Sequence, residues 1–247
     1  MDNTKQENGP LAGKKVIVFG GSAGIGLATA KAAAQEGADV TIISSNQQRI
    51  DKALTQLPAN AKGFAINLTE EQGIKDFFEQ SGNFDHLVYT AGEPLKIVNL
   101  ADVAMPDAKQ YFETRFWGAI TTVKYATPKI NKDGSFVMTS GAAGIKPGKG
   151  WSLGASMCNA MVAFSKAMAI ELAPIRVNVV IPGMVKTDLW SSFPEADREA
   201  MFAHVASTLP VQYVAGPEDI AKTYLHLMLQ SYMTGQSIVV DGGYLLM

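Results

Sequence analysis

One stretch of sequence decides the fold of this chain, and it reads Val16-Ile17-Val18-Phe19-Gly20-Gly21-Ser22-Ala23-Gly24-Ile25-Gly26-Leu27. Its four leading apolar residues predict a short buried strand, and an alanine-rich helix over 27–35 follows the glycine-rich turn. The free N–H groups and the positive end of such a helix bind anions, and glycine lets a diphosphate approach the backbone. A tight turn without a ligand is the alternative, but the flanking strand and helix favour a nucleotide site.

The composition is that of an ordinary globular protein. The chain has 247 residues, of which 47% are hydrophobic and 18% charged. The net charge of −2 gives no electrostatic reason to expect nucleic acid. No apolar run reaches the ~18 residues of a membrane span, so we expect no membrane partner. The polar stretch over 1–10 lacks the apolar core of a secretion signal and is expected to be a disordered lead before a single domain over 11–247.

Cysteine and histidine usage excludes two further kinds of site. The chain has one cysteine, Cys158, so it forms no internal disulfide and suits a reducing cytoplasm, where we expect the protein. Its three histidines are scattered through the sequence and give no spacing typical of metal ligands. We therefore expect no metal.

Strand and helix patterns alternate along the whole chain. Strands are expected over 16–19, 40–43, 63–66, 86–89, 135–139, 176–181 and 237–240, and helices over 27–35, 47–57, 70–80, 106–127, 153–173 and 217–229. This alternation predicts an α/β fold of the Rossmann type, a doubly wound parallel sheet of about seven strands with helices on both faces. Ligands of such sheets bind beyond the carboxyl ends of the strands, and the polar segment 184–212 is expected to cover the substrate there.

Further motifs lie at the expected strand ends, namely Asn67-Leu68, Thr90-Ala91-Gly92, Pro182-Gly183 and Val240-Asp241-Gly242-Gly243. With the phosphate loop, they make residues 11–247 resemble the short-chain dehydrogenase/reductases. The resemblance implies a nicotinamide dinucleotide cofactor, a small-molecule substrate and a homo-oligomer, either a dimer or a tetramer. The residues it implies for the cofactor are Gly20, Ser22, Gly24, Ile25, Gly26, Ser44, Ser45, Asn67, Leu68, Ala91, Gly92, Pro182, Gly183, Val185 and Thr187.

The resemblance fails at the four residues that carry the chemistry of this family, an asparagine, a serine, a tyrosine and a lysine. In the family, the tyrosine exchanges a proton with the substrate oxygen, and the lysine lowers the pKa of that tyrosine. Alignment through the stretch 171–178 puts Arg115, Gly141, Gly154 and Cys158 at these four positions. The chain therefore looks like an atypical branch of the family that lacks the usual tetrad.

Two residues are candidates to replace the missing chemistry. The guanidinium of Arg115 can anchor a carboxylate or polarise a carbonyl, and Ser140 can hydrogen-bond a substrate oxygen. The alternatives are an ion pair of Arg115, with Glu113 or a neighbouring subunit, and a turn cap for Ser140. Trp151 stacks on a flat substrate or packs in the core, whereas Cys158 is expected to be a small buried hydrophobe.

The expected cofactor is NADP(H) rather than NAD(H), because the stretch Ser44-Ser45-Asn46 carries no acid for a ribose 2′-hydroxyl and Arg49 follows it. The expected reaction is NADPH-dependent reduction of an imine or iminium, an activated alkene or a ketone. An iminium needs no proton donor, because hydride transfer leaves a neutral amine. Two alternatives remain: a redox-neutral cyclase or isomerase, and an inactive nucleotide-binding sensor or subunit.

Overall fold

The computed structural model describes residues 9–93 and 95–247, so the predicted lead lies outside the described residues except for its last two positions. Seven strands form one parallel sheet in the order β3-β2-β1-β4-β5-β6-β7. They are β1 (Lys15–Phe19), β2 (Asp39–Ser44), β3 (Lys62–Ala65), β4 (Phe84–Tyr89), β5 (Ile130–Thr139), β6 (Arg176–Pro182) and β7 (Ser237–Val240). The predicted Rossmann-type α/β fold is confirmed.

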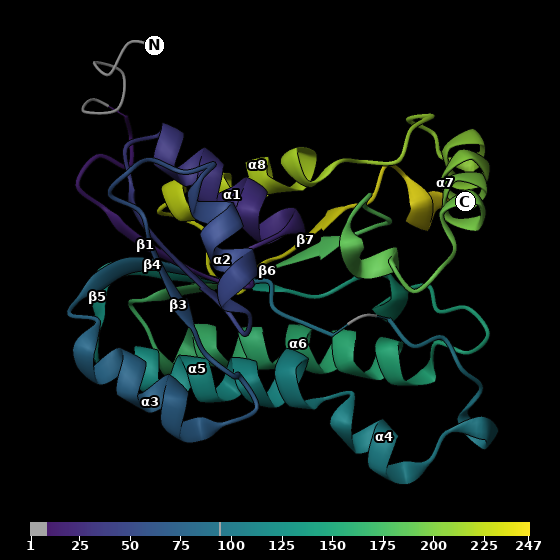
Figure 1. Ribbon diagram of the computed structural model, residues 1–247, viewed down its shortest axis with the longest axis horizontal. Coiled ribbons are helices and arrows are strands. Elements are labelled where there is room, and N and C mark those ends of the chain that lie inside the picture. The colour runs from purple at the N-terminus through teal and green to yellow at the C-terminus, as the bar shows by residue number, and fades with distance from the viewer. Residues whose placement is uncertain (1–8, 94) are drawn as a thin grey trace.

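Helices cover both faces of the sheet (Figure 1). One face carries α1 (Gly24–Gln35), α2 (Gln47–Leu54) and α8 (Pro217–Leu229), and the other carries α3 (Glu71–Gln80), α5 (Gly118–Ala126) and α6 (Ser152–Glu171). The short α4 (Met105–Gln110) and α7 (Glu195–Thr208) lie at one end of the molecule (Figure 1). That end is where the strands finish, so these two helices flank the region in which the ligands of such sheets bind.

The strand β1 divides its side chains between two apolar cores. Val16 and Val18 are buried with α1 and α8, whereas Ile17 and Phe19 are buried with α3 and α5. This division follows from the two-residue period of a strand, which sends successive side chains to opposite faces. Both faces are covered, so the strand reads as a continuous apolar run.

The helix expected over 106–127 is interrupted, and this part of the prediction is wrong. After α4, the residues Glu113–Trp117 form a π-helical turn before α5 begins. Within it the amide of Trp117 donates to the carbonyl of Phe112, five residues back. The turn leaves Thr114 to outside partners: the Tyr89 hydroxyl donates to its carbonyl at 2.5 Å, and its amide donates to Glu93 Oε1 at 2.9 Å. These distant partners stabilise a turn that helical periodicity does not reveal.

The segment 184–212 contains a helix, α7, that the sequence pattern did not predict. Phe202 is the one fully buried residue of this helix, and it packs with Trp190, Leu209 and Val214 in a small apolar cluster apart from the two main cores. Met201, Val205 and Ala206 lie on the same helical face and are partly buried against that cluster. Tertiary contacts of this short apolar face hold the helix in place.

One helix, α6, is long and apolar enough by length and composition to cross a membrane, with a mean hydropathy of 1.3. The expectation concerned uninterrupted apolar runs, whereas this helix reaches its mean hydropathy although polar residues such as Asn159 and Lys166 interrupt it. A core helix of a soluble protein passes the same test, so the feature is weak support for a membrane span. One side of α6, including Met157, Met161 and Ala169, is buried.

Candidate functional site

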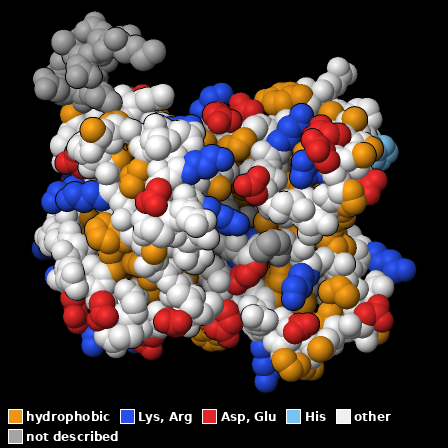
Figure 2. All heavy atoms as spheres, viewed as in Figure 1, with side chains coloured by type: hydrophobic (Ala, Val, Ile, Leu, Met, Phe, Trp, Pro, Cys, Tyr) orange, Lys and Arg blue, Asp and Glu red, His pale blue; other side chains and the backbone are white. Residues whose placement is uncertain are grey.

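A cleft of about 670 Å³ lies at the carboxyl ends of the strands. Its walls come from the glycine-rich turn after β1, the segments that follow β2, β4, β5 and β6, and the first turns of α6. Figure 2 shows this side of the molecule hollowed between two lobes. The volume is within the ~300–1,000 Å³ range of small-molecule sites.

The turn after β1 is packed so closely that only glycine fits at two positions. Gly20 has a φ of +82°, and a Cβ on it would lie 2.6 Å from the amide nitrogen of Ala91. A Cβ on Gly26 would lie 2.2 Å from the carbonyl oxygen of Gly20 and 2.5 Å from Thr90 Oγ1. These two glycines therefore let the turn and the start of α1 pack directly against each other and against the backbone that follows β4.

The N-terminus of α1 faces this turn without a competing side chain. Its N-cap residue, Ala23, makes no side-chain cap, and the first turn of the helix contains no acidic residue. Ser22, Ala23, Gly24 and Ile25 all line the cleft. The first N–H groups of the helix and its positive end are thus available to an anion, and the cradle fits the diphosphate of a dinucleotide.

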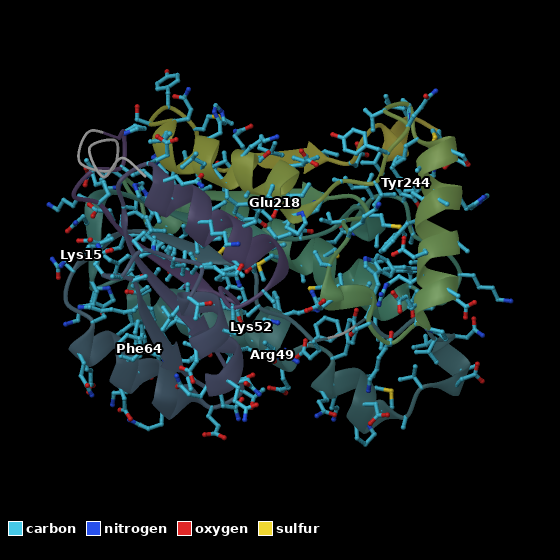
Figure 3. All side chains as sticks on the ribbon, turned by 45° about the horizontal axis from the view of Figure 1, so that its top comes forward. Lys15, Arg49, Lys52, Phe64, Glu218 and Tyr244 are labelled. Atoms are coloured by element: carbon cyan, nitrogen blue, oxygen red, sulfur yellow. The ribbon has the colours of Figure 1, made fainter. Side chains whose placement is uncertain are left out.

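Hydroxyl and guanidinium groups surround the end of β2. Ser22 Oγ donates to Ser44 Oγ at 2.9 Å, and Ser45 and Arg49 line the same part of the cleft. Arg49 lies on α2 and Tyr244 beside α7, on opposite sides of the cleft (Figure 3). This end of the cleft carries donors and a positive charge, a combination that suits a phosphate.

Fourteen of the fifteen residues implied for the cofactor line the cleft: Gly20, Ser22, Gly24, Ile25, Gly26, Ser44, Ser45, Leu68, Ala91, Gly92, Pro182, Gly183, Val185 and Thr187. The exception is Asn67. Its side-chain amide donates to Glu70 Oε1 at 2.8 Å, and its Oδ1 accepts from the Thr69 amide at 3.2 Å. The Asn67 side chain therefore stabilises the turn before α3.

Arg115 projects from the π-helical turn into the cleft wall and pairs with Glu93. Its Nε lies 3.6 Å from Glu93 Oε2, and its Nη2 donates to the Glu93 carbonyl. Gly92 lies directly beneath, because a Cβ there would be 2.4 Å from the guanidinium carbon. The ion pair considered for Arg115 thus forms, but with Glu93 rather than Glu113. Nε and Oε2 are both buried without a hydrogen bond to any described residue.

Ser140 and Cys158 lie together in the cleft wall. Ser140 Oγ donates to the Cys158 carbonyl at 2.8 Å, so the hydroxyl proton is directed at the α6 backbone and its oxygen keeps acceptor capacity. Burial raises the pKa of the Cys158 thiol, and the nearby Ser140 and Arg115 only partly offset this. The thiol is therefore protonated at neutral pH and unsuited to nucleophilic attack. Gly141 and Gly154 also line the cleft.

Three ionisable groups of the cleft, Glu93, Tyr111 and Asp188, were not among the residues expected from the sequence. Glu93 directly follows the Thr90-Ala91-Gly92 motif, and Tyr111 precedes Arg115 by four residues. Their closeness in sequence to residues expected at the site was the signal that could have indicated them. The full sequence has one Tyr-x-x-x-Lys spacing, at Tyr125 and Lys129, but the Tyr125 hydroxyl donates to Glu71 on the surface at 2.6 Å. That pair does not line the cleft.

Lys146 ties the loop after β5 to the segment 244–247. Its ammonium donates to the Tyr244 carbonyl at 3.2 Å and to the Met247 carbonyl, and it lies 4.8 Å from the centre of the Tyr244 ring. Lys146 and Tyr244 both line the cleft. The ammonium of Lys146 is therefore engaged by the C-terminal segment.

Comparisons with known proteins agree with this architecture. A family model described as enoyl-(acyl carrier protein) reductase matches residues 20–245. The short-chain dehydrogenase/reductase ATR9 of Stachybotrys chlorohalonatus is 34% identical, over 94% of this chain and 97% of its own. This chain belongs to the short-chain dehydrogenase/reductase family.

Two solved structures are similar over nearly the full length. A small-chain dehydrogenase in complex with NADPH has a TM-score of 0.84 and 35% identity, covering 95% of this chain and 99% of its own. The MalC reductase/Diels-Alderase from Malbranchea aurantiaca has a TM-score of 0.90 and 26% identity, covering 98% and 100%. The first of these proteins was solved with NADPH bound, and the second is described as both a reductase and a Diels-Alderase.

Proposed function

We propose that this protein binds NADPH and transfers its hydride to a small organic substrate. The observation that carries the proposal is the continuity of one cleft, which joins the glycine cradle after β1 to the pocket around Arg115, Ser140 and Gly154. When bound, the cofactor supplies a hydride and becomes NADP⁺. The similarity to an NADPH-bound dehydrogenase supports the same cofactor here.

The residues of the cleft fit the two ends of the cofactor. The amides at the start of α1 would hold the diphosphate, because this helix has no side-chain cap and no acidic residue in its first turn. Ser44, Ser45 and Arg49 would hold a ribose 2′-phosphate, since this end of the cleft offers donors and a cation but no carboxylate. The preference for NADP(H) over NAD(H) rests on these groups.

The substrate pocket supports reduction of a C=N, C=O or activated C=C bond without the usual tyrosine and lysine. At the aligned positions Gly154 offers no functional group, and Cys158 offers a neutral thiol. A cationic iminium needs no proton, and a carbonyl needs a donor from elsewhere in the pocket. Ser140 and Arg115 are the catalytic candidates from the sequence, and Glu93 now joins Arg115 as a paired group.

The first experiment measures cofactor binding and turnover separately. NADPH and NADH binding are followed by fluorescence titration, and NADPH consumption is followed with 2-methyl-3,4-dihydroisoquinolinium, cyclohexanone and cyclohexenone as probes of three substrate classes. Consumption with at least one probe class is expected. Tight NADPH binding with no consumption of any probe would contradict the reductase and leave a redox-neutral enzyme or a nucleotide-binding sensor.

A substitution at the β2 end tests the cofactor preference. Arg49→Met should weaken NADPH binding about tenfold while leaving NADH binding unchanged, because one charge-assisted contact to a phosphate is lost. Lys52→Met is the matched control, since Lys52 lies one helical turn away on α2 and does not line the cleft. An equal loss of NADPH and NADH binding in Arg49→Met would contradict a 2′-phosphate site.

A redox-neutral ring closure is the second candidate function. The similarity to MalC, which is described as a reductase/Diels-Alderase, is the observation that favours it. Apolar side chains such as Leu95, Met157 and Trp190 line the cleft and would fold a flexible apolar substrate against its own reacting ends. Conversion of a diene-containing probe without NADPH consumption would distinguish this function from reduction.

We also propose that the protein forms homodimers or homotetramers. The family resemblance implies an interface made by the two helices expected over 106–127 and 153–173. Each of these segments carries an exposed apolar side chain, Trp117 at the end of the π-helical turn and Ile170 near the end of α6. Light scattering after size exclusion tests this, and a monomeric mass at micromolar concentration would contradict it.

A further inference from the structure

We infer that the Tyr111 hydroxyl is the group that donates a proton to the substrate in this cleft. The inference rests on the proposed reductase function and names the substrate class for which the pocket is equipped, a carbonyl compound. No sequence pattern singled out Tyr111. Its side chain is assigned this role by its position relative to Gly154 and Arg115.

The Tyr111 ring is fixed by packing while its hydroxyl faces the cleft. Tyr111 follows α4, is 4% exposed and packs with Met157 and Cys158 of α6. Its ring meets that of Phe112 edge-on, with the centroids 6.2 Å apart. The residue lines the cleft, and its hydroxyl makes no hydrogen bond to any residue in 9–93 or 95–247. A phenol with a buried body normally finds a partner for its hydroxyl, so this one is available to a ligand.

Gly154 provides the room for this hydroxyl. A Cβ at position 154 would lie 3.4 Å from the Tyr111 hydroxyl oxygen and 3.4 Å from Cε3 of Trp151. Both distances are ordinary van der Waals contacts, so alanine would just fit and a longer side chain would meet the phenol. The absence of a side chain at Gly154 on α6 thus leaves room for the Tyr111 hydroxyl, which is the functional group at this point of the cleft.

Arg115 supplies the positive charge beside the phenol. Burial raises the pKa of Tyr111, the Arg115 guanidinium opposes this by stabilising the phenolate, and Cys158 and Glu93 raise the pKa further. The group is therefore a neutral donor at pH 7 whose conjugate base has a cation nearby. Arg115 itself is held by both the carboxylate and the backbone carbonyl of Glu93, so its guanidinium has a fixed position.

The proton transfer balances for a carbonyl substrate. Hydride adds to the carbonyl carbon, the C=O π electrons move to oxygen, and that oxygen takes the proton of Tyr111 to give an alcohol. The phenolate left on Tyr111 is next to Arg115 and regains a proton from water, while NADPH is oxidised to NADP⁺. A preformed iminium gains only the hydride and becomes a neutral amine, so its reduction needs no proton from Tyr111.

The test compares two probes in two variants. Tyr111→Phe keeps the packed ring, and Tyr125→Phe is the matched control because it removes a tyrosine hydroxyl outside the cleft. With a ketone, Tyr111→Phe should lower kcat by about 10²–10⁴-fold, the usual size of general acid catalysis, and should abolish the solvent deuterium isotope effect. With 2-methyl-3,4-dihydroisoquinolinium, its kcat should stay within twofold of the unsubstituted protein. Tyr125→Phe should match that protein on both probes.

Several outcomes would overturn the assignment. One is that Tyr111→Phe reduces the ketone as fast as the unsubstituted protein does. Another is that the unsubstituted protein reduces the iminium probe but not the ketone. Either result would overturn the role of Tyr111 without contradicting the proposed reductase function. Gly154→Val provides a second variant that keeps the hydroxyl but blocks it, and it should reproduce the loss with the ketone. Thermal denaturation checks that both variants fold.

A binding measurement separates failure of this assignment from failure of the proposed reductase. If NADPH binds but no probe is reduced, the reductase is refuted, and benzamide, an unreactive carbonyl compound, is titrated into the NADPH complex by calorimetry. Binding that weakens about tenfold in Tyr111→Phe and not in Tyr125→Phe supports Tyr111 as the donor to a carbonyl. Equal binding in the two variants, or none in the unsubstituted protein, overturns it.

Discussion

Substituting Gly92 by alanine tests whether the turn after β4 is shaped by Arg115. A Cβ at this position would lie 2.4 Å from Cζ, 2.6 Å from Nη1 and 2.8 Å from Nε of Arg115. These distances are too short for atoms in contact, so the guanidinium must move. It then loses its hydrogen bond to the Glu93 carbonyl and its ion pair with the Glu93 carboxylate.

The size of the effect follows from these two interactions. A hydrogen bond from a charged donor contributes about 1.5–3 kcal/mol, and a partly exposed ion pair contributes up to about 1 kcal/mol. Gly92→Ala should therefore lower the free energy of unfolding by about 2–4 kcal/mol. This is a large fraction of the ~5–15 kcal/mol that stabilises a typical domain.

The assay is urea denaturation of a double-mutant cycle with Arg115→Met. In the Arg115→Met background there is no guanidinium to displace, so adding Gly92→Ala should cost less than about 0.5 kcal/mol. Gly73→Ala is the control glycine: it lies inside α3, its Cβ would meet only Ile66 Cγ2 at 3.5 Å, and it should stabilise by about 0.5–1 kcal/mol. An equal cost of Gly92→Ala in both backgrounds would refute the reasoning.

Three further predictions follow from other parts of the chain. Gly26→Ala should weaken NADPH binding by about 10²-fold or more in a fluorescence titration, because its Cβ would meet the Gly20 carbonyl at 2.2 Å; binding within threefold of the unsubstituted protein would contradict the cradle. Arg176→Met should lower the free energy of unfolding by about 3–5 kcal/mol, measured in urea, because the buried guanidinium donates to three carbonyls at the end of α8, at 2.7, 2.8 and 2.9 Å. Burial, with a smaller effect of Arg176, lowers the pKa of His86 from 6.5 to about 4. As the pH falls from about 6.5 to 4, this residue should therefore lower the free energy of unfolding by about 1.4 kcal/mol per pH unit. The variant His86→Asn should lack this contribution to the pH dependence.

Two controls accompany these predictions. Arg198→Met removes a half-buried arginine of α7 whose side chain makes no hydrogen bond or ion pair with a described residue, and it should change the stability by less than about 0.5 kcal/mol. An equal effect of both arginine substitutions would exclude a special role for Arg176. For His86 the sign is fixed by linkage. The unfolded chain binds the proton more readily than the folded one between the two pKa values, so protonation favours unfolding there. A stability that rises as the pH falls through this window would contradict the burial argument.

Local sequence determined the fold and most of the nucleotide cradle. The strand β1, the glycine turn and the start of α1 are adjacent in the chain, so the apolar run and the glycine spacing carry the whole signal. Helix α8 and strand β7 have the bounds that the sequence predicts, 217–229 and 237–240, because a proline begins the helix and a β-branched run forms the strand. The alternation of strands and helices along the chain then predicted a parallel sheet, because each helix connects two parallel strands.

Tertiary structure alone decided the substrate end of the cleft. The π-helical turn depends on the Tyr89 hydroxyl and the Glu93 carboxylate, which come from another part of the chain and leave no mark on the helical period of 106–127. The pairing of Arg115 with Glu93 and the approach of Tyr111 to Gly154 join residues that are distant in sequence. Such contacts depend on how the segments after β4 and α4 pack against helix α6. The local sequence around each residue does not indicate which distant residue it contacts.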